Sequence, residues 1–489
     1  MEARNIFNNI SPIDHRYSIS EPEVYQSLVP WISEEASVSA CAKAEIALIH
    51  AHLAVRGKSS PPVREVLEKC AVDSAEVYAE EEKTHHFIRA LVNVLKQKVP
   101  PELAHLVHLG ATSVDILDTS LSWRMAGVTR EVVLPLIKKL ELLLCGFAEK
   151  EAETPQVGRT HGQHAVPITL GFAIAEYVSR IGKSIPEIEK RAKELKGKLS
   201  GAVGAYNATS MIVKDPQELE RIYLEELGLE PSEHSTQLVE PEYLLRLLLE
   251  FNVAFGIIAN LADDLRNLQR SEIGEVREGF SADQVGSSTM PQKRNPWNSE
   301  HVKSLWKAFM PRVNTFFMDQ ISEHQRDLSN SASQRFIADY ITGFCLAVSR
   351  MIKIIEGLSA DRERLLANLN GGGIPGGIMA EPAYILLAET GVSGAHEIIR
   401  KITLSAEKEK LSFAAALAKE PEVLEKIGGK LAELGLIASS ASGALNNAAL
   451  PNDALKDAAL AFFENPQRYS GIAAKKAKTL AEKYRNLLN

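Results

Sequence analysis

A polar stretch from residue 271 to residue 300 carries residue types suited to proton transfer. Its centre, residues 286–296, reads GSSTMPQKRNP. A serine hydroxyl is a poor base, because it ionises far above neutral pH and needs a cation and hydrogen-bond donors to lower that cost. Lys293 and Asn295 lie close enough in sequence to Ser287 to contribute, or to hold an oxyanion that develops on a substrate. The sequence has no Gly-x-Ser-x-Gly elbow, which argues against a hydrolase nucleophile.

A second polar segment, GRTHGQHA at residues 158–165, contains two histidines near glycines. His161 and His164 are three positions apart, a spacing that on a helix would place both on one face and could ligate a metal. No HExxH pattern or carboxylate cluster accompanies them, so we expect no metal. A histidine beside a glycine in a polar turn is the better candidate for general acid–base catalysis.

Three further polar segments each have a structural alternative. Thr112-Ser113-Val114-Asp115 could be a plain helix N-cap, or could hold a carboxylate, because hydroxyls and exposed N–H groups at a helix start bind anions. Two arginines with interleaved hydroxyls at 326–335 suit a phosphate or carboxylate, or else cap a junction between helices. The Asp14–Tyr17 segment, taken alone, is typical of a solvated irregular end.

Long helices are expected to position these segments. Apolar residues recur at alternating spacings of four and three through residues 171–199 and 242–270, as in the seam of a bundle helix. Helical patterns also cover residues 119–153, 296–328 and 334–366, with Asn295 as N-cap and Pro296 opening the fourth helix. Strand signals are sparse. We therefore expect an all-α fold, an elongated central five-helix bundle with smaller N- and C-terminal helical domains.

The expected domain boundaries follow from breaks in this pattern. An N-terminal helical domain is expected over residues 1–115, and the long-helix bundle with the 271–300 loop over residues 116–366. The glycine-rich segment GGGIPGG at 371–377 is typical of a hinge, and a C-terminal helical domain is expected over residues 367–489.

Composition narrows the class of protein. The 489 residues carry a net charge of −8 without a block rich in Lys and Arg, which argues against a nucleic-acid surface. The four cysteines form no CxxC pair and are typical of reduced core residues in a cytosolic protein. The N-terminus has no apolar signal-peptide core, and the apolar run 247–262 is interrupted by polar residues. We expect a soluble cytoplasmic protein that does not bind membranes.

The pattern Ser-Ser-x-Met-Pro-x-Lys-x-Asn-Pro at 287–296 resembles the signature of the fumarase/aspartase superfamily. Members eliminate fumarate, or a close relative, from succinyl-type substrates. Three dispersed regions form each of their sites, contributed by different subunits of a homotetramer with a helical-bundle core. Within the superfamily, segments 11–17, 110–115, 159–165 and 326–335 resemble the adenylosuccinate lyase family, and the resemblance runs from residue 11 to about residue 350.

The resemblance implies a role for each matching position. Ser287 matches the base that removes the Cβ proton of the succinyl group, and Lys293 and Asn295 match the groups that stabilise the carbanion. His161 matches the acid that protonates the leaving nitrogen, and Glu300 the carboxylate that orients it. Substrate-binding positions are matched by His86, His108, Thr112, Ser113, Asp115, Thr160, Gln237, Ser288 and Met290. Contacts to the nucleotide phosphate are matched by Arg16, Tyr17, Arg326, Ser331 and Arg335.

The implied reaction releases fumarate from adenylosuccinate, giving AMP, and from the succinylated aminoimidazole carboxamide ribotide, giving AICAR, in purine biosynthesis. It needs no cofactor or metal. Another lyase or cycloisomerase of the superfamily and a non-catalytic structural protein on the same fold are the alternatives. His161 counts against a cycloisomerase, and the phosphate-directed arginines count against fumarase. Two departures from the family pattern concern base recognition: Phe87 stands where Asp is common, and Glu240-Pro241-Glu242 where Pro-Arg-Asp is common.

Overall fold

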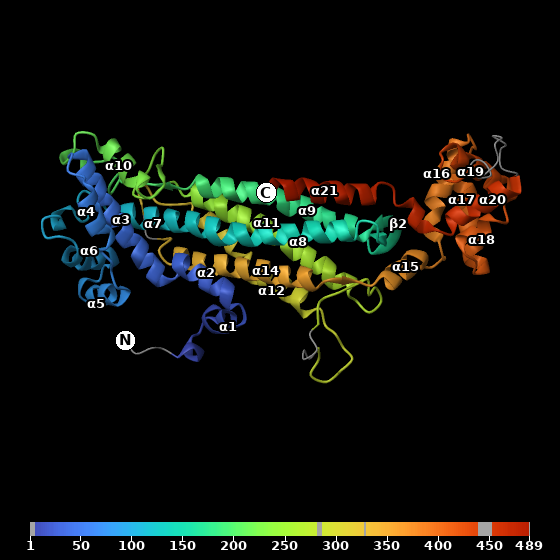
Figure 1. Cartoon of the computed structure of the whole chain (residues 1–489), viewed down its shortest axis with the longest axis horizontal. Helices are drawn as coiled ribbons and strands as arrows, with labels where there is room; N and C mark the ends of the chain where they lie inside the picture. The colour runs from blue at the N-terminus through green and yellow to red at the C-terminus, as the bar shows by residue number, and fades with distance from the viewer. Residues whose placement is uncertain (1–4, 281–285, 327–328, 439–451, 489) are drawn as a thin grey trace. The chain divides into compact units, whose positions relative to one another are not determined.

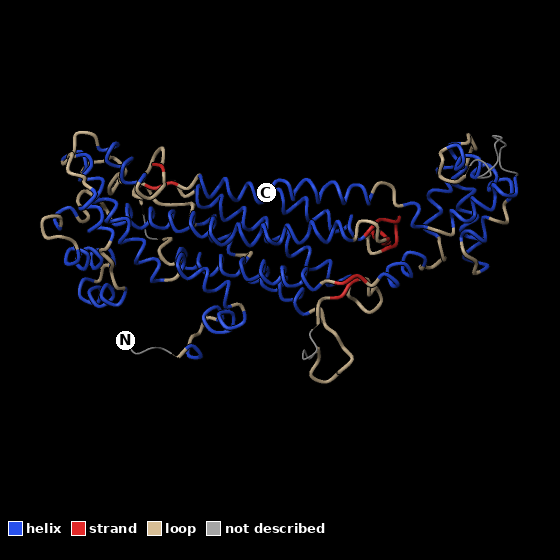
Figure 2. The backbone as a smooth tube through the Cα atoms, in the orientation of Figure 1, coloured by secondary structure: helices blue, strands red, loops and turns tan. Residues whose placement is uncertain are grey.

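The computed structural model describes residues 5–280, 286–326, 329–438 and 452–488 (Figure 1). Helices dominate, and the described strands are short and pair only two at a time (Figure 2). The predicted all-α class is confirmed. The chain divides into two compact units: unit 1 comprises Met1–Leu140, Ile181–Ala262 and Glu300–Lys353, and unit 2 comprises Glu141–Arg180, Asp263–Ser299 and Ile354–Asn489.

Unit 1 contains the N-terminal helices and a part of each long helix. Its own helices and strands are η1 (Ile6–Asn8), η2 (Ile13–Tyr17), α1 (Ser18–Ser20), α2 (Pro22–Ile32), α3 (Glu34–Val55), α4 (Pro61–Glu68), α5 (Ser74–Thr84), α6 (Phe87–Lys98), η3 (Ala104–Leu106), α7 (Ser113–Val128), η4 (Thr129–Val133), β3 (Lys196–Gly197), η5 (Thr209–Met211), α10 (Pro216–Glu225), β4 (Glu230–Pro231), α13 (Arg312–Met318) and η6 (Ser333–Phe336). The helices that continue into both units are α8 (Leu134–Lys150), α9 (Leu170–Lys193), α11 (Glu242–Leu268), α12 (Trp297–Phe309) and α14 (Ile337–Gly357).

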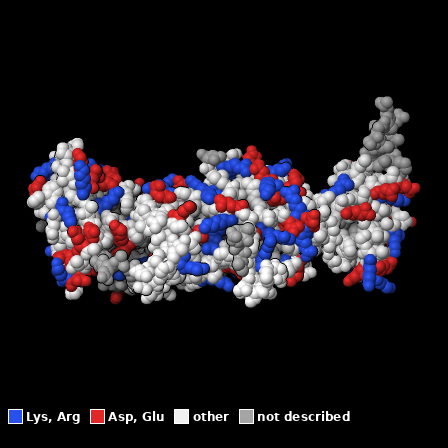
Figure 3. Space-filling view, turned by 60° about the horizontal axis from the view of Figure 1, so that its bottom comes forward, with Lys and Arg blue, Asp and Glu red and all other residues white. Residues whose placement is uncertain are grey.

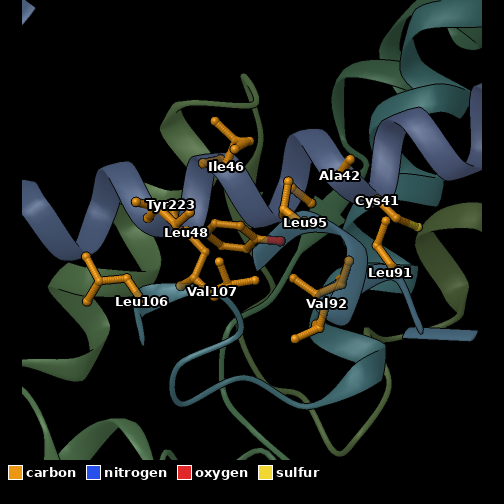
Figure 4. Packing of buried hydrophobic residues seen from close by; sticks show 14 of the residues in the cluster. Cys41, Ala42, Ile46, Leu48, Leu91, Val92, Leu95, Leu106, Val107 and Tyr223 are labelled. Atoms are coloured by element: carbon orange, nitrogen blue, oxygen red, sulfur yellow. The ribbon is translucent and has the colours of Figure 1, made fainter. Parts of the chain in front are cut away.

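Two apolar clusters hold unit 1 together. The first joins α3, α6 and α10 around Leu48, Leu91, Leu95 and Tyr223 (Figure 4). The second joins α11 and α14, where the ring of Phe344 stacks on Phe251 and meets Phe255 edge-on. Aromatic rings in these geometries stabilise the interface beyond the area that they bury. Leu109 and Ala111, in the loop that leads into α7, pack against the first cluster.

Unit 2 contains a hairpin of β1 (Pro155–Thr160) and β2 (Gln163–Thr169), and β5 (Val276–Arg277) paired with β6 (Ser359–Ala360). Its C-terminal helices surround a separate apolar cluster that includes Phe413, Phe462 and Phe463. The elements around this cluster are η7 (Gly377–Met379), α16 (Ala380–Glu389), α17 (Ala395–Glu409), α18 (Phe413–Leu417), α19 (Pro421–Glu433), α20 (Asn452–Phe463) and η8 (Pro466–Tyr469). The unit also contains α15 (Arg362–Asn370) and α21 (Ala473–Leu488).

The structure differs from the sequence-based expectation in the long helices. The helix expected over 334–366 ends at Gly357 and is followed by β6, and α15 begins at Arg362. The helix expected over 296–328 begins at Trp297 and ends at Phe309, ahead of Pro311, after which the short α13 follows. Because α12 begins at Trp297, the residue before it is Pro296 and not the predicted cap Asn295, whose side-chain amide donates to the Gly286 carbonyl. Instead the Glu278 carboxylate accepts the backbone N–H of Ser299 in the first turn of α12 (3.0 Å), a position where a negative charge is favourable.

Two helical stretches, Pro22–Val55 and Glu242–Leu268, are long and apolar enough to cross a membrane by length and composition alone. Of the most apolar part of each, 72% and 56% are buried within the protein, and mostly buried core helices meet the same criteria of length and composition. On the face shown in Figure 3, Lys and Arg are interspersed with Asp and Glu. That face has no continuous basic surface of the kind that nucleic-acid binding uses.

Candidate active site

His161 lies at the tip of the β1–β2 hairpin, not on a helix. Thr160 and Gln163 face each other across the hairpin, so His161 and Gly162 form a two-residue turn. Both have positive φ, +53° and +74°, as a type I′ turn requires. His161 is exposed there, while His164 sits on β2 opposite Arg159. The shared helix face that a metal pair would need is therefore absent, and no cluster of three metal-ligand side chains occurs among the described residues.

The buried carboxylate of Glu275 fixes the base of this hairpin. Its two oxygens accept hydrogen bonds from both terminal nitrogens of Arg159 (3.1 and 2.5 Å) and from the Gln156 amide (2.8 Å) on β1. The Asn368 side chain on α15 donates to it as well (2.9 Å). Glu275 is completely buried, and Arg159 retains 17% exposure of its side chain. A bidentate, buried pair of this kind restricts the orientation of the strand that leads to Thr160 and His161.

The signature segment closes on itself around Ser287. The Ser287 Oγ accepts the backbone N–H of Met290 (3.1 Å) and lies 3.4 Å from that of Thr289. Asn295 donates to the Gly286 carbonyl (3.0 Å), and a Cβ at Gly286 would overlap the Lys293 carbonyl, so the two ends of the segment touch. Ser288, Met290 and Lys293 are exposed. Residues 281–285 of the predicted loop lie outside the described residues.

The helix start predicted at Thr112 is present, with Thr112 as the N-cap of α7 and its N–H bound to Asp115 (2.8 Å). Asp115 was expected to contact the substrate, but its side chain has no exposed surface. Its carboxylate is completely buried and pairs with the equally buried Lys198. The same carboxylate accepts the N–H groups of Ser200 and Gly201. With no exposed atom, it supports the Thr112–Ser113 turn from behind.

Two predicted histidines adjoin this helix start. His86 is the N-cap of α6: its Nδ1 accepts the N–H of Arg89 (3.2 Å), and its Nε2 lies 3.5 Å from the Ser113 Oγ. His108 is held by Glu45, which accepts both its Nδ1–H (2.6 Å) and its backbone N–H (2.9 Å). The structure therefore brings His86 and Ser113 together. Phe87, one of the departures from the family pattern, packs against the apolar cluster of α3 and α6.

Gln237 and Arg326 lie on two loops that are joined to each other. The backbone N–H of Gln237 donates to the carbonyl of Gln325 (3.3 Å). Two residues further, the N–H of Val239 donates to Asp118 on α7 (3.0 Å). Burial raises the pKa of Asp118 to about 6, although the positive charges of Lys198 and Arg326 oppose this rise. The sequence analysis did not single out Asp118, which follows Asp115 by three positions in the same motif.

Tyr17 contacts a residue that the sequence analysis also missed. Its hydroxyl lies 3.0 Å from Nε2 of His301 on α12. Burial lowers the pKa of His301, and the positive charges of Arg350 and Arg16 act in the same direction. The remaining predicted positions, Arg16, Thr160, Glu300, Ser331 and Arg335, are exposed. Among the described residues, no hydrogen bond or ion pair joins His161 to Ser287, Lys293 or Asn295.

Comparison with known proteins places this chain in a class. Residues 8–308 match the family described as lyase. The fold is that of the 3-carboxy-cis,cis-muconate lactonizing enzyme from Pseudomonas putida, with a TM-score of 0.78 over 95% of this chain and 98% of that one, at 22% identity. The chain is a lyase of the fumarase/aspartase superfamily.

The particular family follows from two further matches. Residues 322–437 match the family described as adenylosuccinate lyase C-terminal. Adenylosuccinate lyase from Pyrococcus horikoshii is 34% identical over 426 residues, which are 85% of this chain and 91% of that protein. The Pyrococcus abyssi adenylosuccinate lyase is 33% identical with the same coverage. This chain belongs to the adenylosuccinate lyase family.

Proposed function

We propose that this chain cleaves adenylosuccinate to AMP and fumarate by β-elimination, and the succinylated aminoimidazole carboxamide ribotide to AICAR and fumarate. The observation that carries this proposal is the family membership over most of the chain, together with Ser287, Lys293, Asn295 and His161 in the expected motifs. The reaction needs a base at Cβ, a group that holds the carbanion, and an acid at the leaving nitrogen.

Ser287 acts as the base. Its Oγ already faces backbone N–H groups of Met290 and Thr289, and such donors lower the cost of forming an alkoxide. The alkoxide takes the Cβ proton, and the electron pair of the C–H bond delocalises into the adjacent carboxylate of the substrate. The exposed Lys293 and the half-buried Asn295 stabilise that charge.

His161 acts as the acid. When the electron pair forms the C=C bond of fumarate, the C–N bond breaks and the nitrogen takes a proton from the imidazole. An exposed hairpin tip held at its base by the Arg159–Glu275 pair suits this role, because the imidazole can enter a site while its backbone stays fixed. Glu300 orients the imidazole.

Binding is divided between two sets of residues. The succinyl dicarboxylate and the nucleobase of the substrate contact the loop that leads into α7 and residues that we propose lie near it. These residues are His86, His108, Thr112, Ser113, Thr160, Gln237, Ser288 and Met290. Asp115 supports this loop through its buried bonds. The phosphate contacts Arg16, Tyr17, Arg326, Ser331 and Arg335, which gives a net-acidic chain a local positive site. We further propose that the protein is a cytoplasmic homotetramer whose subunits share each site.

The test is fumarate release from the purified protein, measured by absorbance, with adenylosuccinate and argininosuccinate in parallel. We expect cleavage of adenylosuccinate alone, at a rate that a chelator leaves unchanged. Release of fumarate from neither substrate by a folded protein would refute the substrate assignment. Loss of activity with the chelator would refute the metal-free mechanism.

A further inference from the structure

Glu45 is a carboxylate with an unusual place in the fold. It lies in the middle of α3 and is completely buried, and the residues before and after it, Ala44 and Ile46, belong to the apolar cluster. Figure 4 shows Cys41, Ala42, Ile46 and Leu48 of α3, all members of that cluster. A buried carboxylate needs hydrogen-bond donors to offset the loss of water. The donors that bind Glu45 therefore show which part of the chain this carboxylate holds in place.

The donors come from one residue. Among the described residues, every hydrogen bond to Glu45 comes from His108: the backbone N–H reaches Oε2 at 2.9 Å and Nδ1 reaches Oε1 at 2.6 Å. The two residues are 63 positions apart. A carboxylate that uses both oxygens on one residue fixes its backbone and its side chain at the same time.

The backbone of His108 needs such a support. Its φ is +61°, in the left-handed region that residues other than glycine rarely adopt. Neighbouring contacts hold the same turn: His52 binds the Leu109 carbonyl through Nε2 (2.8 Å), and Gly110, with φ +80°, leaves no room for a Cβ beside Ile212. Strain of this kind persists where surrounding contacts over-determine the backbone, and it concentrates at functional sites.

The outward atom of His108 is Nε2. Because Nδ1 donates its proton to Glu45, the ring orientation is fixed and Nε2 is the only ring nitrogen left for another partner. No described residue bonds to it, and 22% of the side chain is exposed. His108 is followed within five residues by Thr112 and Ser113, the helix start that we propose binds the substrate.

We propose that Glu45 is a positioning residue for catalysis: it sets the turn and the ring orientation of His108 so that Nε2 meets the bound substrate. This inference rests on the proposed function through the role of His108. A carboxylate behind an imidazole plays the same part in many metal and catalytic sites, where loss of the partner costs about 10- to 100-fold in binding or activity.

The variant Glu45→Gln tests the proposal, because an NH2 donor replaces one of the two oxygens, so one of the two N–H groups of His108 faces another donor. We expect kcat/KM for adenylosuccinate to fall about 10- to 100-fold, mainly through KM. The decisive comparison is a double-mutant cycle with His108→Ala. If Glu45 acts through His108, the double variant is no worse than His108→Ala alone, within about twofold.

Glu220→Gln is the matched control. Glu220 is another buried carboxylate of unit 1, which accepts the N–H of Leu199 (2.7 Å) and the hydroxyl of Tyr206 (2.6 Å). Its effect on kcat/KM should add to that of His108→Ala. If Glu45→Gln does not fold, Glu45→Asp replaces it in the cycle, since that change keeps the charge and shortens the reach. Additive losses for Glu45 and His108, or an unchanged kcat/KM in the Glu45 variant, would overturn the proposal.

Hydrogen exchange of the segment 107–113 gives a second measurement that needs no substrate. We expect its amides to exchange at least about tenfold faster in Glu45→Gln and unchanged in Glu220→Gln. If the wild-type protein releases no fumarate, the proposed function is wrong, and unchanged exchange in the Glu45 variant then removes the positioning role as well.

Discussion

At the scale of single residues, the surroundings of Ser287 decide whether it can act as a base. The two backbone N–H groups near its Oγ supply part of what an alkoxide needs. The other part, a nearby cation, is present in the same segment as Lys293. A hydroxyl in this setting differs from an ordinary surface serine, and a substitution that removes only the hydroxyl tests the difference.

We expect Ser287→Ala to lower kcat by about 10³-fold or more, because general-base catalysis alone contributes on the order of 10²- to 10⁴-fold. Fumarate release from adenylosuccinate measures the change, with circular dichroism and mass determination as checks that fold and assembly persist. Ser405→Ala, at a half-buried serine on α17 that binds Glu409, is the control and should keep full activity. Full activity of Ser287→Ala would assign the base to another residue.

A second residue-scale prediction concerns Glu141, which is buried in α8. Burial raises its pKa to about 9 from 4.5. Among the described residues its Oε2 has no hydrogen-bond partner, and the Cys145 thiol is the group that approaches the other oxygen (3.9 Å). Because the folded-state pKa lies above the unfolded one, the folded chain binds this proton more tightly. The free energy of unfolding therefore falls as pH rises from about 4.5 to about 9, by about 1.4 kcal/mol per pH unit from this group.

Glu141→Met replaces the carboxylate by an uncharged side chain of similar volume, and so removes the fall in the free energy of unfolding with rising pH that Glu141 causes. We expect the variant to unfold at higher urea concentration than the wild type at pH 8, and the gap to narrow steadily towards pH 5. Urea unfolding followed by circular dichroism at several pH values measures it. Glu149→Gln, an exposed position on the same helix, should show no such pH-dependent gap. Parallel pH dependences for wild type and Glu141→Met would contradict the raised pKa.

At the scale of elements, the β1–β2 hairpin shows how a mostly helical chain presents one histidine. The positive φ of His161 and Gly162 makes a tight turn, and the Glu275 cluster joins β1 to α15 through Arg159 and Asn368. The imidazole thus sits on a short, braced element. Its position depends on a buried pair that does not itself meet the substrate.

We expect Glu275→Gln to lower kcat about 10- to 100-fold with a smaller change in KM, because a loosened hairpin misplaces the acid but, of the proposed binding residues, only Thr160. The free energy of unfolding should fall by about 1–3 kcal/mol, since Arg159 loses its charged partner. Steady-state kinetics and urea unfolding measure the two effects. Glu272→Gln, an exposed neighbour that pairs with Arg270, should change neither. An unchanged kcat in Glu275→Gln would show that the Arg159–Glu275 pair does not control the position of His161.

Sequence patterns predicted the elements whose signal is local. The long helices follow from apolar spacing, and the start of α7 follows from Thr112 and Asp115 three residues later. The hairpin at 155–169 was missed, because its polar residues show no alternation and pairing between strands is decided by contacts elsewhere, here Glu275. The Glu45–His108 pair could not be predicted from the sequence either, since Glu45 lies within an apolar helical run that is far from His108 in sequence.

At the scale of the whole molecule, several apolar side chains lie on surfaces of helices that otherwise form cores. Val253 on α11 is 53% exposed and Leu142 on α8 is 41% exposed. Single exposed apolar residues are common, but positions in the middle of bundle helices are those that a homotetramer with a helical core would cover.

The division into three domains stays a prediction, since the described chain separates into two compact units whose borders fall within long helices.

The shared-site proposal makes a quantitative prediction for mixtures. If His161 and Ser287 of one site come from different subunits, an inactive His161→Ala chain and an inactive Ser287→Ala chain can together form intact sites. In randomly assembled tetramers from equal amounts, about a quarter of the sites receive both native residues, because each is supplied with a chance of about one half. We therefore expect co-expression, or joint refolding, to restore about 25% of wild-type kcat with an unchanged KM. The control is a chain that carries both substitutions, mixed with the wild-type chain. In that mixture, intact sites arise from wild-type subunits only. If the two single variants remain inactive together while native mass spectrometry shows mixed tetramers, both residues belong to one subunit in each site.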